Sequence, residues 1–121
     1  MSTARRELGD AVERAAQALM ERAGLALVTR QFSTRHGEID LVMRDGDTIV
    51  FTEVRYRAHQ SYGGGAGSVD GFKQARLVKA AQGWIAEHPA LAMVPMRFDV
   101  IAASGPPGQL AFDWIRDAFR A

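Results

Sequence analysis

The stretch that decides the fold is GEIDLVMRDGDTIVFTEVRYR, residues 37–57. In its first part Ile39, Leu41 and Met43 alternate with Glu38, Asp40, Val42 and Arg44. Such a period of two predicts a β-strand. The pair Asp45-Gly46 predicts a tight two-residue turn. The residues that follow, 49–57, are rich in β-branched and aromatic types and predict a returning strand. The stretch therefore predicts a β-hairpin.

The predicted hairpin gathers acidic side chains on one face. Opposite residues share a face, and so do residues two apart on one strand. With Asp45-Gly46 as the loop, Glu53 is expected opposite Glu38 and diagonal to Asp40. A four-residue loop keeps the same parity and brings Glu53 opposite Asp40. In either case Glu38, Asp40, Glu53 and Arg55 are expected on one side, with Asp40 and Glu53 about 5–8 Å apart.

Like charges on one face of a sheet repel one another unless something compensates them. One interpretation is a solvated face on which Arg55 and Arg57 neutralise the acids. The other is a magnesium or manganese site to which Asp40 and Glu53 each contribute a carboxylate, with Arg55 beside it. The spacing favours the first interpretation and leaves both open.

Outside the hairpin, the sequence predicts a single α/β domain over residues 1–121, with helices packed on a mixed β-sheet. A helix over 70–88, capped by Ser68 or Asp70, is expected to end at Pro89. The strand at 98–102 is almost wholly apolar and is expected to be interior. The other expected elements are a helix over 3–24, a strand over 25–32, a turn over 33–36, a glycine-rich flexible loop over 58–68, a short strand over 109–112 and a terminal helical turn.

Composition sets broad limits on the function. Hydrophobic residues at 47% and charged residues at 24% are typical of a folded globular protein. The sequence lacks an apolar run of about 18 residues, so no membrane span is expected. No secretory signal is expected either. There are no cysteines, which excludes disulfides and thiolate chemistry, and the cytoplasm is the default compartment.

The charge balance leaves the partner open. A net charge of +1 neither supports nor excludes a nucleic acid. Lys73, Arg76 and Lys79 follow one another at intervals of three on the predicted helix, with no acid among them. They form either a solvated face or a ridge that contacts phosphates. Asp99 lies in the apolar strand and is expected to pair with Arg97 or with a backbone group.

Several short motifs in a fixed order suggest a relationship. GEIDLV (37–42) and FTEVRYR (51–57) together resemble the D–x(n)–(D/E)–x–K pattern of the PD-(D/E)xK nuclease superfamily. Nearly the whole chain resembles the YraN-like family of uncharacterised bacterial proteins. The further motifs of that family are Gly9 and Glu13 in the first helix, KQARL (73–77) and RFDV (97–100). The family is similar to archaeal Holliday-junction resolvases, so the resemblance implies a restriction-endonuclease-like fold.

The resemblance also implies roles for single residues. Asp40 and Glu53 match the catalytic, metal-binding acids of the superfamily, and Glu13 matches a helix glutamate that joins the metal site. Arg55 stands where the superfamily has a lysine. An arginine stays protonated and cannot accept a proton from water, although it can offset negative charge. Lys73 is a less favoured source of the missing amine.

The expected function is therefore nucleic-acid binding, with magnesium- or manganese-dependent cleavage of branched or single-stranded DNA or RNA as its enzymatic form. Arg57, Lys73 and Arg76 are the expected nucleic-acid contacts. The alternative is a module with a nuclease-like fold that binds nucleic acid or protein without turnover. A second copy of the chain is a further candidate partner.

Overall fold

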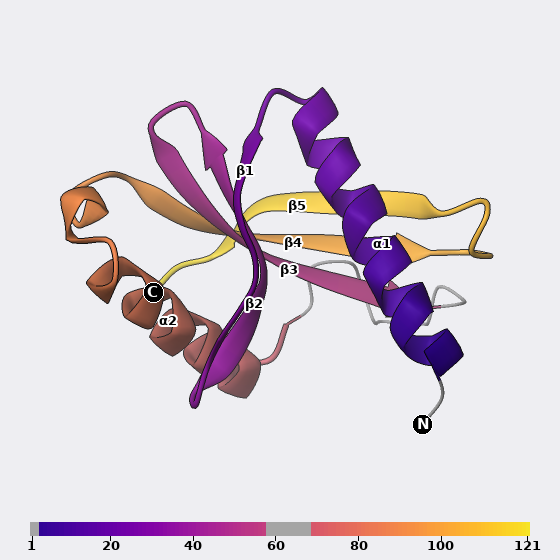
Figure 1. The fold of residues 1–121 in the computed structure, drawn as a ribbon, viewed down its shortest axis with the longest axis horizontal. Coiled ribbons are helices and arrows are strands. Elements are labelled where there is room, and N and C mark those ends of the chain that lie inside the picture. The colour runs from indigo at the N-terminus through magenta and orange to yellow at the C-terminus, as the bar shows by residue number, and fades with distance from the viewer. Residues whose placement is uncertain (1–2, 58–68) are drawn as a thin grey trace.

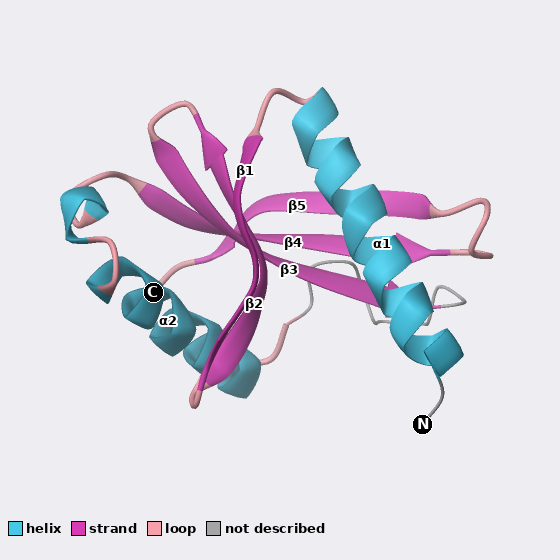
Figure 2. Cartoon of the chain, viewed as in Figure 1, coloured by secondary structure: helices cyan, strands magenta, loops and turns pink. Residues whose placement is uncertain are grey.

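The computed structural model describes residues 3–57 and 69–121 and has two α-helices and a five-stranded sheet (Figures 1 and 2). The predicted glycine-rich loop over 58–68 lies outside the described residues. No described helix has the length and apolar character that crossing a bilayer requires. In chain order the elements are α1 (Thr3–Arg22), β1 (Ala26–Thr34), β2 (Gly37–Asp45), β3 (Thr48–Arg57), α2 (Gly71–Ala86), the 3₁₀ turn η1 (Pro89–Leu91), β4 (Met96–Ser104) and β5 (Ala111–Phe119).

The strands lie side by side in the order of the chain, so β3 is the central strand. The pairs β1–β2, β2–β3 and β4–β5 are antiparallel, whereas β3 and β4 are parallel. Parallel neighbours need a crossover connection, and here that connection contains α2. The sheet is mixed, as the sequence predicts, and the strand containing residues 98–102 is interior.

The two helices cover opposite faces of the sheet. The evidence is that alternate residues of the central strand, whose side chains point to opposite faces, belong to different apolar clusters. Phe51 packs with the residues of α2, and its ring lies 5.8 Å from that of Trp84 in an edge-to-face arrangement. Val50 packs instead with Met20 of α1. The result is an α/β fold of three layers, consistent with a restriction-endonuclease-like core. The predicted fold class is confirmed.

The turn of the β2–β3 hairpin differs from the prediction by one residue. Asp45 pairs with Thr48, so the two-residue loop is Gly46–Asp47 rather than Asp45-Gly46. Gly46 has a φ of +60°. A glycine with positive φ at the first loop position fits a type II′ turn, which follows the twist of the strands. The shift keeps the odd–even parity of the pairing from Leu41–Thr52 to Asp45–Thr48. The predicted alternation of β2 fails at one point, because Ile39 packs with Val42 on the α2 side, whereas Leu41 and Met43 pack on the α1 side.

The C-terminal region also differs from the prediction. The structure has one strand, β5, over Ala111–Phe119, where the sequence suggested a shorter strand and a helical turn. The register against β4 shifts between Phe98 and Val100, and Asp117 on β5 has a φ of +52°. A bulge of this kind interrupts the period of two and gives the apolar residues a helix-like spacing.

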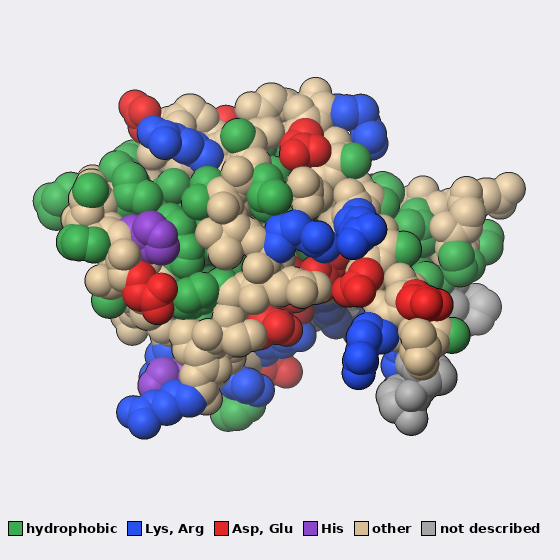
Figure 3. All heavy atoms as spheres, viewed as in Figure 1, with side chains coloured by type: hydrophobic (Ala, Val, Ile, Leu, Met, Phe, Trp, Pro, Cys, Tyr) green, Lys and Arg blue, Asp and Glu red, His purple; other side chains and the backbone are tan. Residues whose placement is uncertain are grey.

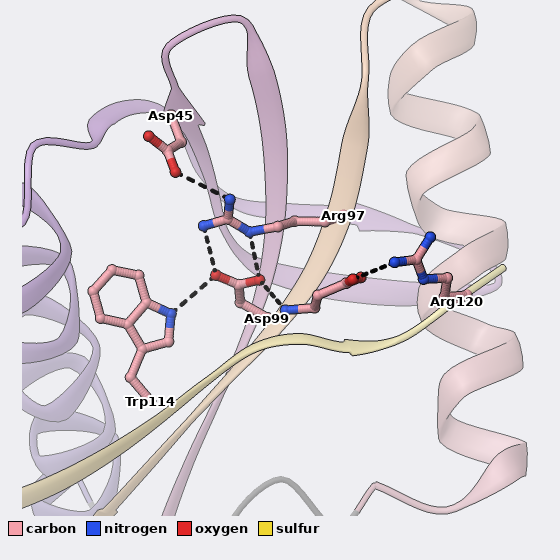
Figure 4. A network of polar contacts seen from close by, with 6 residues as sticks. Asp45, Arg97, Asp99, Trp114 and Arg120 are labelled. Carbon is pink, nitrogen blue, oxygen red and sulfur yellow. Dashed lines mark hydrogen bonds and ion pairs between the residues drawn. The ribbon is translucent and has the colours of Figure 1, made fainter.

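A buried polar network ties β5 to β4 (Figure 4). Asp99 accepts hydrogen bonds from Arg97 Nε at 2.9 Å, from Trp114 Nε1 at 2.9 Å and from the Asp117 amide at 2.9 Å. Arg97 also donates to Asp45 at 3.0 Å. The prediction that Asp99 pairs with Arg97 or a backbone group is confirmed. These bonds satisfy the buried carboxylate and give it a structural role.

Candidate functional site

A hollow of about 490 Å³ opens between the β2–β3 hairpin and the first turns of α2. It is called the acidic hollow below. In the space-filling view, acidic and basic side chains gather between the lower end of β2 and α1 (Figure 3). The residues that line the acidic hollow are Gly37, Glu38, Asp40, Glu53, Val54, Asp70, Phe72, Lys73, Arg76 and Leu77.

Asp40 stands where the two strands of the hairpin separate. The backbone pairing of β2 with β3 runs from Asp45–Thr48 to Leu41–Thr52. At the next step the Val54 amide donates to Asp40 Oδ2 at 2.8 Å. The aspartate side chain thus takes the place of a backbone acceptor. This bond fixes the carboxylate between the strands, at the edge of the acidic hollow.

The surroundings of Asp40 disfavour its charged form. Burial and then the charge of Glu53 raise the pKa of Asp40 from its ordinary value of 3.8 to about 8. The hydrogen bond from Val54 acts in the opposite direction, and the charges of Glu13 and Glu38 add to the increase. The effect of Glu53 reflects the closeness of the two acids that the hairpin parity predicted.

Glu53 is buried on the central strand and forms an ion pair with Lys73 of α2. Lys73 Nζ lies 2.5 Å from Glu53 Oε2. The start of α2 is held by Asp70, whose side chain accepts from the Lys73 amide at 2.8 Å. Asp70 was one of the two predicted N-caps. The cap fixes the first turn of α2 with its lysine directed at the acid of the sheet.

Gly37 lets α2 approach β2 closely. A Cβ atom at this position would lie 3.1 Å from the Arg76 backbone oxygen. Nearby, Arg76 Nε donates to the His36 carbonyl at 2.9 Å. The glycine of the GEIDLV motif therefore has a packing role, and it brings Arg76 to the rim of the acidic hollow.

Glu13 approaches from α1 on the other side of the sheet. Gln31 Nε2 donates to Glu13 Oε1 at 3.1 Å. Burial is the largest of the effects that raise the pKa of Glu13 above its ordinary value, and the charges of Glu38 and Asp10 also raise it. Glu13 is close enough for its charge to act on Asp40, but it does not line the acidic hollow.

The two arginines of β3 lie further along the strand. Arg55 is two residues beyond Glu53, so the alternation of the strand puts it on the same face. It is half-buried, whereas Arg57 at the end of the strand is exposed. Neither belongs to the described lining of the acidic hollow. The cations that line it are Lys73 and Arg76 of α2.

The acidic hollow contains some, but not all, of the oxygen ligands that a small, hard cation needs. Asp40 and Glu53 bring carboxylate oxygens from neighbouring strands, which is the ligand type that magnesium and manganese prefer. Among residues 3–57 and 69–121, however, no group of three or more acidic, histidine or cysteine side chains has the arrangement of a metal centre. Two protein carboxylates suit magnesium, which usually keeps several waters and takes its other ligands from substrate phosphates.

Two features of the acidic hollow do not follow from sequence pattern. Phe72 lines the hollow although it is apolar and lies outside the buried stripe of α2. The one sequence signal for an exposed position was that Phe72 does not fit the spacing of that stripe. Lys73 meets Glu53 because of the path of the crossover. The run of basic residues was the one sequence signal for that contact.

Comparison with a family model and comparison with individual proteins point to the same family. The family model "Uncharacterised protein family UPF0102" matches residues 12–103. The chain is 57% identical over 121 residues to the "UPF0102 protein" of Xanthomonas oryzae pv. oryzae (strain PXO99A), covering 100% of this chain and 98% of that protein. A UPF0102 protein of Xylella fastidiosa (strain M12) is 53% identical over 116 residues, covering 96% of this chain and 94% of that protein.

Proposed function

This chain belongs to Uncharacterised protein family UPF0102, and we propose that it is a nucleic-acid-binding protein that cleaves phosphodiester bonds of branched or single-stranded DNA or RNA. The observation that carries the proposal is the composition of the acidic hollow. The carboxylates of Asp40 and Glu53 share it with the Lys73 amine, which lies 2.5 Å from Glu53. Carboxylates that can hold a divalent cation, beside an amine that can offset negative charge, are suited to hydrolysis of a phosphodiester.

Asp40 and Glu53 are the residues that would hold a magnesium or manganese ion. Such an ion, when bound, supplies Lewis-acid activation of a phosphate oxygen and of the attacking water. The Val54 amide supports this role because it orients the Asp40 carboxylate. A cation between the two acids would also relieve the mutual repulsion that raises the pKa of Asp40.

Lys73 takes the part that the superfamily gives to the lysine at the position of Arg55. Its ammonium group can offset the charge that develops on the phosphate oxygens during attack. Unlike a guanidinium group, an amine can also exchange a proton with the attacking water. Arg76, at the rim of the same hollow, can bind a flanking phosphate through its planar fork. Arg57 remains a proposed contact further along the strand.

The ion pair between Lys73 and Glu53 favours a second candidate function. In it the lysine gives the buried glutamate a counter-charge from within the chain. Such a protein could bind nucleic acid, or a protein, through the basic rim without turnover. The two candidates differ in whether phosphodiester bonds are cleaved when a divalent cation is present.

The test is a cleavage assay with labelled single-stranded and branched DNA and RNA, in magnesium, in manganese and in EDTA. The proposal predicts cleavage that requires a divalent cation and is abolished by Asp40→Asn and by Glu53→Gln. Binding without cleavage would favour the inactive module. Cleavage in EDTA would overturn the proposed use of the acids. An Asp113→Asn variant, on β5 and outside the described lining, is the matched control for loss of one acid.

A further inference from the structure

Phe72 is an aromatic side chain left exposed beside the acidic hollow. It occupies the first turn of α2, immediately before Lys73, and it lines the hollow. Its exposed fraction is 74%. Among the described residues the other exposed large hydrophobic side chains are Val28, Met93 and Met96, none of them aromatic. A single exposed apolar side chain is ordinary on a protein surface. Phe72 is distinguished by its place, because it lines the acidic hollow beside Lys73 and Arg76.

The helix does not need Phe72 for its packing. The buried residues of α2 are Leu77, Ala80, Ala81 and Trp84. At 100° per residue, Leu77 lies about 140° around the helix from Phe72. The ring therefore lies off the buried face of α2 and lines the acidic hollow.

The neighbours of Phe72 are cations of the kind that bind phosphates. Arg76, one turn later, places its guanidinium 5.9 Å from the centre of the Phe72 ring. Lys73 is the next residue and directs its amine into the hollow. An aromatic face beside Lys and Arg side chains is the arrangement by which proteins hold unpaired nucleotides, with the ring stacked on a base and the cations on the backbone.

We propose that Phe72 is a stacking platform for an unpaired base of a nucleic acid whose backbone runs over Lys73 and Arg76 into the acidic hollow. This inference rests on the proposed function and names the substrate class within it. A base inside a continuous duplex is stacked on both faces and cannot cover the ring. The preferred ligand is therefore single-stranded, or branched with unpaired nucleotides, rather than intact duplex.

The test compares binding by fluorescence anisotropy at low salt in EDTA, which prevents cleavage. The probes are a labelled single-stranded oligonucleotide, the same strand with abasic sites at its centre, and a duplex of equal length. Phe72→Ala removes the ring and Phe72→Tyr retains it. Met93→Ala is the matched control, because Met93 is 95% exposed and does not line the acidic hollow.

Phe72→Ala is expected to weaken binding of the intact single strand by about 5- to 100-fold. It should leave binding of the duplex and of the abasic strand unchanged, while Phe72→Tyr and Met93→Ala match the natural chain. If Phe72→Ala binds the single strand as tightly as the natural chain, or loses duplex binding equally, the stacking role is wrong while the proposed function stands. If the natural chain binds none of the probes, the proposed function fails, and this inference fails with it.

Discussion

Lys73 Nζ lies 2.5 Å from Glu53 Oε2, so an amine from the first turn of α2 reaches a buried acid of the central strand. These residues are twenty positions apart in the sequence. The residue that the motif FTEVRYR places next to Glu53 on the same face is Arg55, which cannot act as a proton acceptor. The fold thus brings an amine of α2 into contact with the buried acid.

The first prediction follows from this contact. Lys73→Met should lower the single-turnover rate of oligonucleotide cleavage by about 10²–10⁴-fold, the usual effect of losing a positioned proton-transfer group. Arg55→Lys should leave the rate nearly unchanged, because the amine is already present. The opposite pattern, a faster Arg55→Lys variant and an unaffected Lys73→Met variant, would assign the chemical role to position 55. Thermal melting of each variant controls for loss of folded protein.

The second prediction concerns how the free energy of unfolding depends on pH. The pKa of Asp40 is raised from 3.8 to about 8 in the folded chain, so between these values the folded state holds a proton that the unfolded state has lost. The stability contributed by protonated Asp40 is complete below pH 4 and is lost as the pH rises through 8. Its slope is at most about 1.4 kcal/mol per pH unit.

Asp40→Asn removes this proton while the amide oxygen can still accept from Val54. Urea unfolding in EDTA should therefore give similar free energies of unfolding for both chains near pH 4. Near pH 8 the variant should be the more stable of the two. A difference between the chains that stays constant across this range would show that Asp40 titrates normally. Because the charges of Glu53, Glu13 and Glu38 all act on Asp40, the pH dependence that the variant removes belongs to this group of acids together.

The third prediction tests the close approach of α2 and β2. Gly37→Ala places a Cβ atom 3.1 Å from a backbone oxygen of α2 and should destabilise the chain by about 1–3 kcal/mol. Gly9→Ala, in an open position of α1 with no atom within 4 Å, should stabilise it by about 0.5–1 kcal/mol. Urea denaturation of both variants checks the contrast, and equal effects would contradict the packing role of Gly37.

The fourth prediction concerns salt. Arg76→Gln should weaken nucleic-acid binding and reduce the slope of log affinity against log salt concentration by about 1, the value for one lost phosphate contact. Arg120→Gln, at the end of β5 and already paired with Asp117 at 2.6 Å, is the control and should leave the slope unchanged. An unchanged slope for Arg76→Gln would remove that residue from the interface.

The local pattern of apolar and polar residues was sufficient to predict the β2–β3 hairpin and its acidic residues. The period of two predicted Asp40 and Glu53 on one face, and both line the acidic hollow. The period itself breaks beside Asp40, because Ile39 packs with Val42 and not with Leu41 and Met43. The turn itself was misplaced because both Asp45-Gly46 and Gly46–Asp47 can close a tight hairpin. The strand β5 was misread because the bulge at Asp117 gives its apolar residues a helix-like spacing.

Contacts between distant elements could not be read from the sequence. Whether Lys73 reaches Glu53 depends on how the crossover returns α2 to the sheet, and the close passage at Gly37 depends on the same path. The exposed face of Phe72 also becomes evident only once the buried side of α2 is known. The sequence thus named the acids of the candidate site and, as weaker candidates, Lys73 and Arg76, but it indicated neither the ion pair of Lys73 with Glu53 nor the exposed ring of Phe72.

The most direct test of the proposed acid pair is a manganese titration followed by electron paramagnetic resonance, with and without a non-cleavable phosphorothioate single strand. We expect one bound manganese per chain, with tighter binding when the oligonucleotide is present and no binding in either Asp40→Asn or Glu53→Gln. Asp113→Asn should bind as the natural chain does. Absence of bound manganese even with the oligonucleotide, or equal binding by all four chains, would contradict a cation site at Asp40 and Glu53.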